Sequence, residues 1–148
     1  MKNSEFVAKA DVERACKRLG MRDWSSTSDI NVGSDEAAAI LEVVGGEANE
    51  VDLEDFREGL QIELEHGTRF ADANITNNHP ILTGKIVLAH LKESLLYYKR
   101  LIIVEIEGDL LKAVKTHDDK KARSLCHRIA CARLELNQAE VNYLADTQ

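Results

Sequence analysis

The stretch Asp52-Leu-Glu-Asp-Phe-Arg-Glu-Gly-Leu-Gln-Ile-Glu-Leu-Glu-His-Gly67 decides the fold class, because it carries the start, one face and the end of an α-helix. Asp52 is a typical N-cap residue, and Asp55 at the third position approaches the capping-box pattern. Gly67 suits the left-handed position that closes a helix, so we expect this helix to end at His66. A buried face is predicted by apolar residues at i, i+4 and i+8, namely Phe56, Leu60 and Leu64.

Two shorter helices are predicted before this stretch. The first begins at Ser4 or Asp11 and ends where Gly20 can adopt a left-handed conformation. A polar loop over residues 25–34 leads to a second helix over residues 35–44. The chain therefore reads as a series of helices separated by glycines and capping residues.

Longer helices are predicted after the quoted stretch. Pro80 suits the first turn of a helix, where its missing N–H costs nothing. We expect this helix to run to about Lys115, with Gly84 as a weak point. From Leu95 onward it is apolar nearly all round, which is typical of a helix that is central or shared with another chain.

The last helix carries a heptad pattern. Seven residues recur at alternating spacings of 3 and 4, which is typical of a seam that packs closely on a second helix. One interpretation is packing within the chain, as a helical hairpin; the other is self-association or binding of a protein partner. The seam consists of Ala122, Leu125, Ile129, Ala132, Leu136, Ala139 and Tyr143.

Taken together, these patterns predict an all-α fold of about five helices that ends in a long antiparallel helical hairpin. The net charge of −7 argues against nucleic acid as the main partner. The densest apolar stretch, residues 94–111, is interrupted by five charged side chains and is too polar to span a bilayer. We therefore expect neither nucleic acid nor a membrane among the partners.

The cysteines indicate the compartment. There are three, an odd number without a Cys-x-x-Cys pair, which predicts reduced thiols in a cytosol-like environment. We expect Cys126 and Cys131 to be small core residues. The first six residues lack an apolar signal core, so the expected location is cytoplasmic or in a virion, and not secreted.

Polar residues that could bind a metal gather at the end of the quoted stretch. Glu63 and His66 are three apart on one helix face, the spacing that di-iron four-helix bundles use. His90 and Glu93 form the reversed pair on the next helix, and all four could bind zinc or iron. The alternative needs no cofactor: His66 suits the C-terminal end of a helix, and Glu63 pairs with Arg57 or Arg69.

The asparagine-rich loop at residues 72–78 places oxygen atoms at alternate positions, as the start of a calcium loop does. Its sixth position is Asn77 and not glycine, and its twelfth is Thr83 and not glutamate. Local turns made by the asparagine side chains explain the loop better. Neither a G-x-S-x-G motif nor a serine cluster with a nearby histidine is present, so the sequence favours a protein without enzymatic activity.

Two blocks of sequence resemble a family of small helical proteins of unknown function that occur in bacteria and tailed phages. The first block is the quoted stretch; the second comprises Asn74-Ile-Thr76, Leu82-Thr-Gly-Lys-Ile-Val-Leu-Ala-His-Leu-Lys-Glu93 and Tyr97-Tyr98. A leading segment, Leu19-Gly-Met-Arg-Asp-Trp24, also fits. The chain departs from the family pattern by an extra stretch near residues 25–50, by a long helix after residue 116, and by Ser94-Leu-Leu96 in place of a Pro-Asp pair.

The resemblance implies no known activity, but it implies a phage or virion origin. It also points to a shared set of polar residues: Glu63, Glu65, His66, Thr83, Lys85, His90 and Glu93. In a cofactor-free protein, Glu65, His79, Thr83 and Lys85 would form a polar network around the helix end.

We therefore expect one helical domain over residues 1–148. It divides into N-terminal helices and a loop (1–50), a family-like core (51–102) and a C-terminal hairpin extension (103–148). The expected function is that of a small non-enzymatic structural or interaction protein, phage-encoded and associated with a particle or its assembly. Its rival is a zinc- or iron-binding helical protein.

Overall fold

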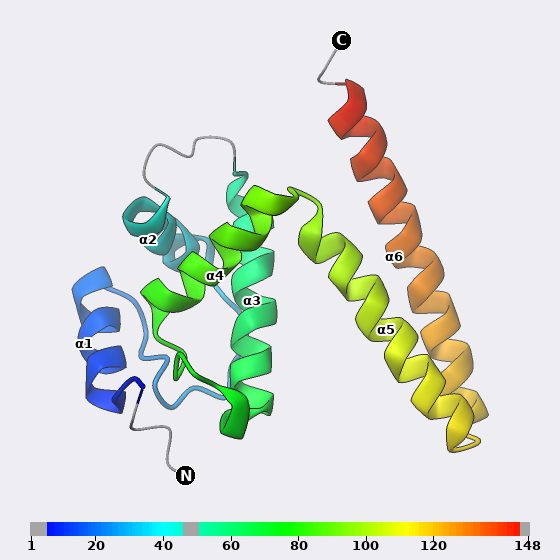
Figure 1. The fold of residues 1–148 in the computed structure, drawn as a ribbon, viewed down its shortest axis with the longest axis horizontal. Helices are drawn as coiled ribbons and strands as arrows, with labels where there is room; N and C mark the ends of the chain where they lie inside the picture. The colour runs from blue at the N-terminus through cyan, green and yellow to red at the C-terminus, as the bar shows by residue number, and fades with distance from the viewer. Residues whose placement is uncertain (1–5, 46–50, 146–148) are drawn as a thin grey trace. The chain divides into compact units, whose positions relative to one another are not determined.

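The structure is a computed structural model that describes residues 6–45 and 51–145. The alternative helix start at Ser4 lies outside the described residues. Those residues form six α-helices, one short 3-10 helix and no strand, which confirms the all-α fold class (Figure 1). The elements are α1 (Lys9–Leu19), α2 (Ser34–Val44), α3 (Leu53–Arg69), η2 (Ala71–Ala73), α4 (Pro80–Glu93), α5 (Tyr97–Lys115) and α6 (Asp119–Ala145).

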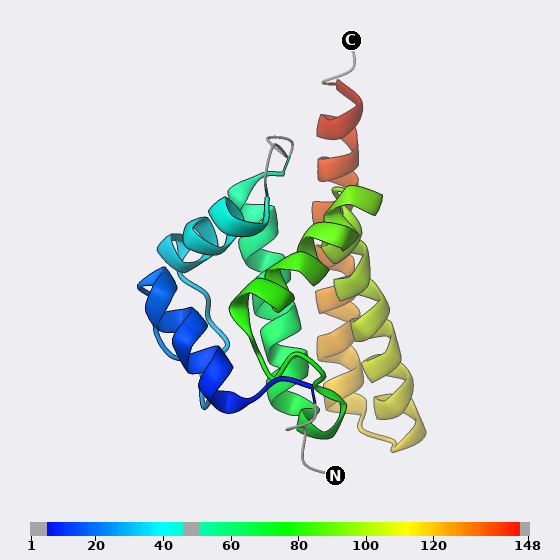
Figure 2. The same cartoon turned by 60° about the vertical axis from the view of Figure 1, so that its left-hand side comes forward.

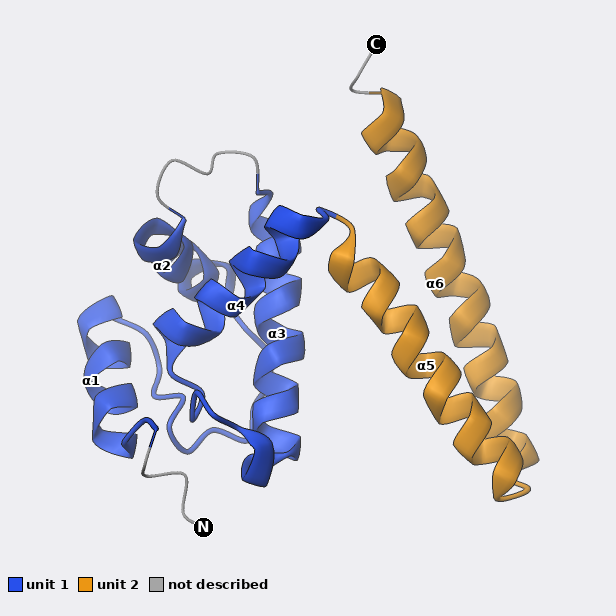
Figure 3. Cartoon of the chain, viewed as in Figure 1, with its two compact units in different colours: residues 1–95 blue, residues 96–148 orange. Residues whose placement is uncertain are grey.

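The chain divides into two compact units, residues 1–95 and residues 96–148 (Figure 3). Unit 1 contains α1 to α4, and unit 2 contains α5 and α6. Unit 2 begins at Leu96, seven residues before the hairpin extension that the sequence predicts.

In unit 1 the helices α2, α3 and α4 pack against one another, and α1 packs on α4 and α2 (Figure 1). The predicted face of α3 is correct, because Phe56, Leu60 and Leu64 are all fully buried. Burying such side chains removes apolar surface from water, which contributes about 1.5–3 kcal/mol each. The largest fully buried side chain is that of Trp24, in the segment between α1 and α2.

The helix α3 starts as predicted but ends later. The side chain of Asp52 accepts hydrogen bonds from the backbone N–H groups of Glu54 and Asp55. The prediction of an end at His66 with Gly67 as the closing residue is wrong, because α3 continues to Arg69. Gly67 lies inside the helix, where the absence of a side chain leaves room for Asn74 and Asn78 of the following loop.

The prediction of one helix from Pro80 to Lys115 is also wrong. The chain leaves α4 at Ser94, whose backbone is extended (φ −155°, ψ 124°), and α5 begins at Tyr97. Serine tolerates such a helix end because its hydroxyl can hydrogen-bond to nearby backbone groups outside a helix. Neither proline nor glycine marks the break, which is why the sequence pattern did not reveal it.

Unit 2 is the predicted antiparallel hairpin: α5 and α6 lie side by side in both views (Figures 1 and 2). Its core is small and is made of Ile106, Ala113, Leu125 and Ile129. Ala122 and Ala132 of the predicted seam pack against this core, whereas Tyr143 is 53% exposed. Two ion pairs link the helices, Arg100–Glu140 at 2.6 Å and Arg133–Glu107 at 2.9 Å.

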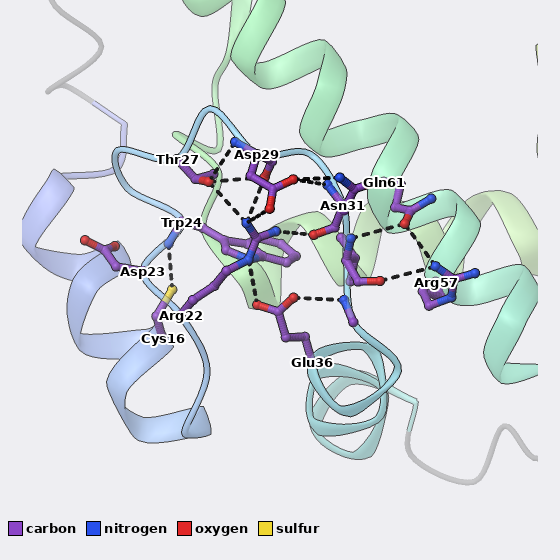
Figure 4. A network of polar contacts seen from close by, with 12 residues as sticks. Cys16, Arg22, Asp23, Trp24, Thr27, Asp29, Asn31, Glu36, Arg57 and Gln61 are labelled. Carbon is purple, nitrogen blue, oxygen red and sulfur yellow. Dashed lines mark hydrogen bonds and ion pairs between the residues drawn. The ribbon is translucent and has the colours of Figure 1, made fainter.

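A polar network holds the segment between α1 and α2 in place (Figure 4). The guanidinium of Arg22 donates to the Glu36 carboxylate at 3.0 Å and to the carbonyls of Asp29 and Asn31. The indole N–H of Trp24 donates to the same Glu36 oxygen at 3.2 Å. The Arg22 side chain therefore holds the segment in place by donating to several acceptors. Such acceptors would destabilise the fold if they were removed from water without a hydrogen-bond donor.

Close packing of α4 on α2 depends on Gly84. A Cβ atom at this position would lie 2.5 Å from Cγ2 of Ile40, a fully buried core residue. Gly84 is thus a point of close helix approach and not the weak point that the sequence suggests. By contrast, a Cβ atom at Gly108 in α5 would meet nothing within 4 Å.

The two glycines predict stability changes of opposite sign. Gly108→Ala should stabilise the protein by about 0.5–1 kcal/mol, since alanine is the better helix former. Gly84→Ala gains the same propensity but overpacks the core, and should destabilise by about 1–3 kcal/mol. Urea denaturation followed by far-ultraviolet circular dichroism measures both. A stabilising Gly84→Ala would contradict the close approach of α4 to α2.

Candidate functional site

A cavity of about 320 Å³ lies in unit 1, beside the C-terminal half of α3. The loop after α3 and the first turns of α4 complete its wall. Its lining residues are Glu63, His66, Gly67, Phe70, Ala73, Asn74, Ile75, Thr76, Thr83 and Ile86. The cavity therefore combines one carboxylate and several polar groups with apolar side chains, as ligand sites do.

The loop wall is fixed to α3 by asparagine side chains. The Asn74 amide donates to the Gly67 carbonyl at 3.1 Å and to Oδ1 of Asn78 at 2.7 Å. A Cβ atom at Gly67 would lie 2.8 Å from Nδ2 of Asn74 and closer still to Asn78. Only glycine at position 67 leaves room for the loop to pack against α3 in this way. Asn77 and Asn78 adopt left-handed backbone conformations (φ 49° and 61°), which asparagine tolerates better than most residues.

Thr83 is the most deeply buried polar residue of the cavity wall. It lies in the first turn of α4 and is only 4% exposed. Its backbone N–H donates to the His79 carbonyl at 2.9 Å.

The four predicted metal ligands are brought together only in part. Nδ1 of His90 lies 3.5 Å from Oε1 of Glu63, so these two side chains form an ion pair when the imidazole is protonated. His66 lies on the cavity, with its ring 6.4 Å from that of Phe70, and Glu93 is exposed. Among residues 6–45 and 51–145, no group of three or more His, Cys, Asp or Glu side chains is arranged to hold a metal ion.

The two arginines suggested as partners of Glu63 make other contacts. Arg57 binds Glu54 at 2.8 Å, and the Arg69 guanidinium lies 5.2 Å from the centre of the Phe70 ring. Of the predicted polar network, Thr83 lines the cavity, whereas Glu65 and Lys85 are exposed. Sequence reasoning missed the apolar wall, because nothing in the spacing of Phe70, Ile75 and Ile86 marks them as neighbours.

His79 borders this region at the start of α4. Its Nδ1 atom is buried and has no hydrogen-bond partner among the described residues. Burial lowers the pKa of His79 below its ordinary value of 6.5, and the positive charge of Arg18 lowers this pKa further. Folding therefore favours the neutral imidazole.

Two of the three cysteines differ in burial from what the sequence predicts. Cys16 is buried and accepts a hydrogen bond from the Trp24 backbone, and burial raises the pKa of its thiol. Cys126 and Cys131 are exposed on α6, so the prediction that they are core residues is wrong. All three are free thiols.

Unit 2 carries a second feature of functional interest, a pair of exposed apolar side chains on each of its two helices. Val104 and Leu111 on α5 are seven residues apart, as are Leu134 and Val141 on α6. A seven-residue spacing returns to the same helix face. The four side chains are between 60% and 72% exposed. We call these four residues the outer apolar residues.

None of the described helices combines the length and the apolar character that crossing a bilayer requires. The fold and the cavity define a small all-α protein with a helical hairpin. A family model described as "Protein of unknown function (DUF5661)" matches residues 12–107, which is well over half of the chain, and the chain belongs to this family. The match includes the whole cavity. The comparisons with curated proteins and with solved structures gave no match.

The shifted pKa of His79 predicts a pH dependence of stability. Because the folded pKa lies below 6.5, the unfolded chain binds a proton first as the pH falls. The stability contributed by neutral His79 is complete above pH 6.5 and is lost as the pH falls toward the folded pKa. From pH 7.5 to 5.5 the wild type should therefore lose stability.

The His79→Gln variant should lose less stability than the wild type over this range. The difference is at most about 1.4 kcal/mol per pH unit, which is the limit for the binding of one proton. Arg18→Gln should change the slope in the same direction, since its charge is the second cause of the shift. Urea denaturation followed by the fluorescence of Trp24, the single tryptophan, measures the slope. Identical slopes for wild type and His79→Gln would contradict this account.

Proposed function

We propose that the protein is a non-enzymatic interaction protein that self-associates through the outer apolar residues of its C-terminal hairpin. The observation that carries the proposal is the exposure of four apolar side chains at heptad spacing on both helices of unit 2. Large exposed apolar side chains are available to a partner. Two hairpins that pair through them would form a four-helix bundle.

The charge distribution of α6 supports a second copy of this chain as the partner. The part of α6 that ends at Arg133 is basic apart from Asp119, and the part after Arg133 carries acidic residues and no lysine or arginine. Antiparallel pairing of two copies brings the basic part of each helix to the acidic part of the other, which favours encounter and fixes orientation. The charged residues are Asp119, Lys120, Lys121, Arg123, Arg128 and Arg133 in the basic part, and Glu135 and Glu140 in the acidic part.

The small size of unit 2 also supports association. Its core consists of four buried residues and the side chains packed against them. Two helices alone bury little apolar surface, and units of this size are commonly stabilised by oligomerisation.

A role in a phage particle or its assembly is the finer part of the proposal. It is supported by the resemblance of the blocks at residues 52–67 and 74–98 to phage-encoded proteins. Free thiols, two of them exposed, support a cytoplasmic or virion location and not secretion. We assign no cofactor to this function. The zinc or iron hypothesis stays a prediction, which elemental analysis of protein purified without a His tag or chelator would test.

Light scattering coupled to size-exclusion chromatography tests the proposal. We expect the wild type to elute at twice its chain mass of 16.5 kDa. Replacing both Leu111 and Leu134 with glutamine should weaken association more than tenfold, because each buried leucine contributes about 1.5–3 kcal/mol.

Val43→Gln is the matched control, since Val43 is an apolar residue of unit 1 that is 55% exposed. It should leave the mass unchanged. A wild type that remains monomeric at micromolar concentration would overturn the proposal. Equal dissociation by the control would overturn it too.

A further inference from the structure

Two residues on the exposed surface of α6 have the chemistry of metal ligands. His127 and Cys131 are four residues apart, so their side chains lie on one face of the helix. Both residues are exposed, and Nδ1 of His127 lies 3.8 Å from Sγ of Cys131. Imidazole nitrogens and thiolate sulfurs are the ligands that zinc prefers in proteins.

The distance between the two atoms fits a shared metal ion. Zinc binds a histidine nitrogen at about 2.0–2.1 Å and a cysteine sulfur at about 2.3 Å, in tetrahedral geometry. These values place the nitrogen and the sulfur about 3.6 Å from each other. The observed separation of 3.8 Å is close to this value, so one zinc ion can bind both side chains almost as they stand.

The pair supplies only half of a tetrahedral site. Within residues 6–45 and 51–145, no third His, Cys, Asp or Glu side chain joins it in a cluster that could hold a metal ion. Structural zinc sites almost always have four protein ligands. The other two ligands must therefore come from another molecule, and the same pair of residues in a second copy of the chain supplies them.

The pair lies on the same face of α6 as one of the outer apolar residues. His127, Cys131 and Leu134 follow one another at spacings of 4 and 3, which keeps them on one helix face. Leu125 and Ile129, which are buried in the hairpin core, each precede a member of the pair by two residues and so lie on the opposite side of α6. A second copy that covers Leu134 therefore also covers the pair.

The charges of α6 bring the pair of one copy beside the pair of the other. Arg128 and Glu135 are exposed and seven residues apart, so they flank the same side of this face. In an antiparallel dimer, Arg128 of each copy meets Glu135 of the other when the twofold axis passes between residues 131 and 132. The middle residue of α6 (Asp119–Ala145) is number 132, so this register also overlaps the whole helix. The two copies of Cys131 then lie next to each other.

We propose that two copies of the chain bind one zinc ion between their α6 helices, through His127 and Cys131 of each copy. This proposal rests on the self-association proposed above. Two thiolates and two neutral imidazoles balance the charge of Zn²⁺, and each thiol releases one proton to the solvent when the ion binds. The bound ion fixes the antiparallel register that the charged residues favour.

The test is the zinc content of full-length protein without a His tag, kept in a reductant that is not a thiol. The metal-free protein is loaded with zinc chloride, desalted, and analysed for metal and for mass by light scattering. We expect one zinc ion per two chains, at twice the chain mass of 16.5 kDa. Co²⁺ in place of zinc should give the intense absorption of a tetrahedral cobalt–thiolate complex.

Three variants locate the site. Cys131→Ser and His127→Gln should each weaken zinc binding at least about tenfold, since the loss of a group that only orients a metal ligand already costs about 10–100-fold. Cys126→Ser is the matched control, because Cys126 is also exposed on α6 but lies five residues from Cys131 and points elsewhere. It should retain both the zinc and the cobalt absorption. Circular dichroism reports whether each variant folds.

The outcomes separate this site from the association itself. A metal-free dimer that takes up no zinc would overturn the site and leave the association intact. Zinc that Cys131→Ser does not remove would overturn the site, as would one zinc ion on each monomeric chain. A metal-free monomer that dimerises with one zinc ion would support the site and overturn association without metal. A monomer that binds no zinc would overturn both proposals.

Discussion

The contact between Gly67 and the asparagine loop is the constraint on which the rest of unit 1 depends. The Asn74 side chain donates to the carbonyl of Gly67 and to Asn78, and no side chain fits at position 67 beneath it. This contact lets α3 continue past the expected end and brings the chain back so that Pro80 can start α4. The same contact closes one wall of the cavity. A single glycine thus links the end of one helix, the course of a loop and the formation of a site.

The two units differ in charge and in the kind of surface they offer. Unit 1 holds most of the negative charge and a cavity lined by a carboxylate and by apolar side chains. Unit 2 contains 8 acidic and 9 basic residues, so little net repulsion opposes its self-association. It offers apolar side chains at heptad spacing. These properties assign association to the second unit in our account.

Much of the fold was predictable from the sequence, for physical reasons that can be named. Helix starts follow from local chemistry, as at Asp52 and Pro80, and buried faces follow from periodicity, as at Phe56, Leu60 and Leu64. The errors concern positions where distant segments meet. Gly67 and Gly84 look like helix breaks in sequence, yet both are needed because another part of the chain approaches closely. Of the site, the sequence identified Glu63, His66 and Thr83 but not the apolar wall, since no local pattern encodes which loop covers a helix.

The central claim is that Gly67 allows the asparagine loop to pack against α3 and that this packing forms one wall of the cavity. The most direct test is the sign of the stability change for Gly67→Ala, measured by urea denaturation with Trp24 fluorescence. A glycine inside an exposed helix gains about 1 kcal/mol on replacement by alanine. Our account predicts the opposite, a loss of about 1 kcal/mol or more, because the methyl group displaces Asn74 and Asn78 and breaks their hydrogen bonds. A stabilised Gly67→Ala protein with unchanged amide signals in the loop would contradict the account.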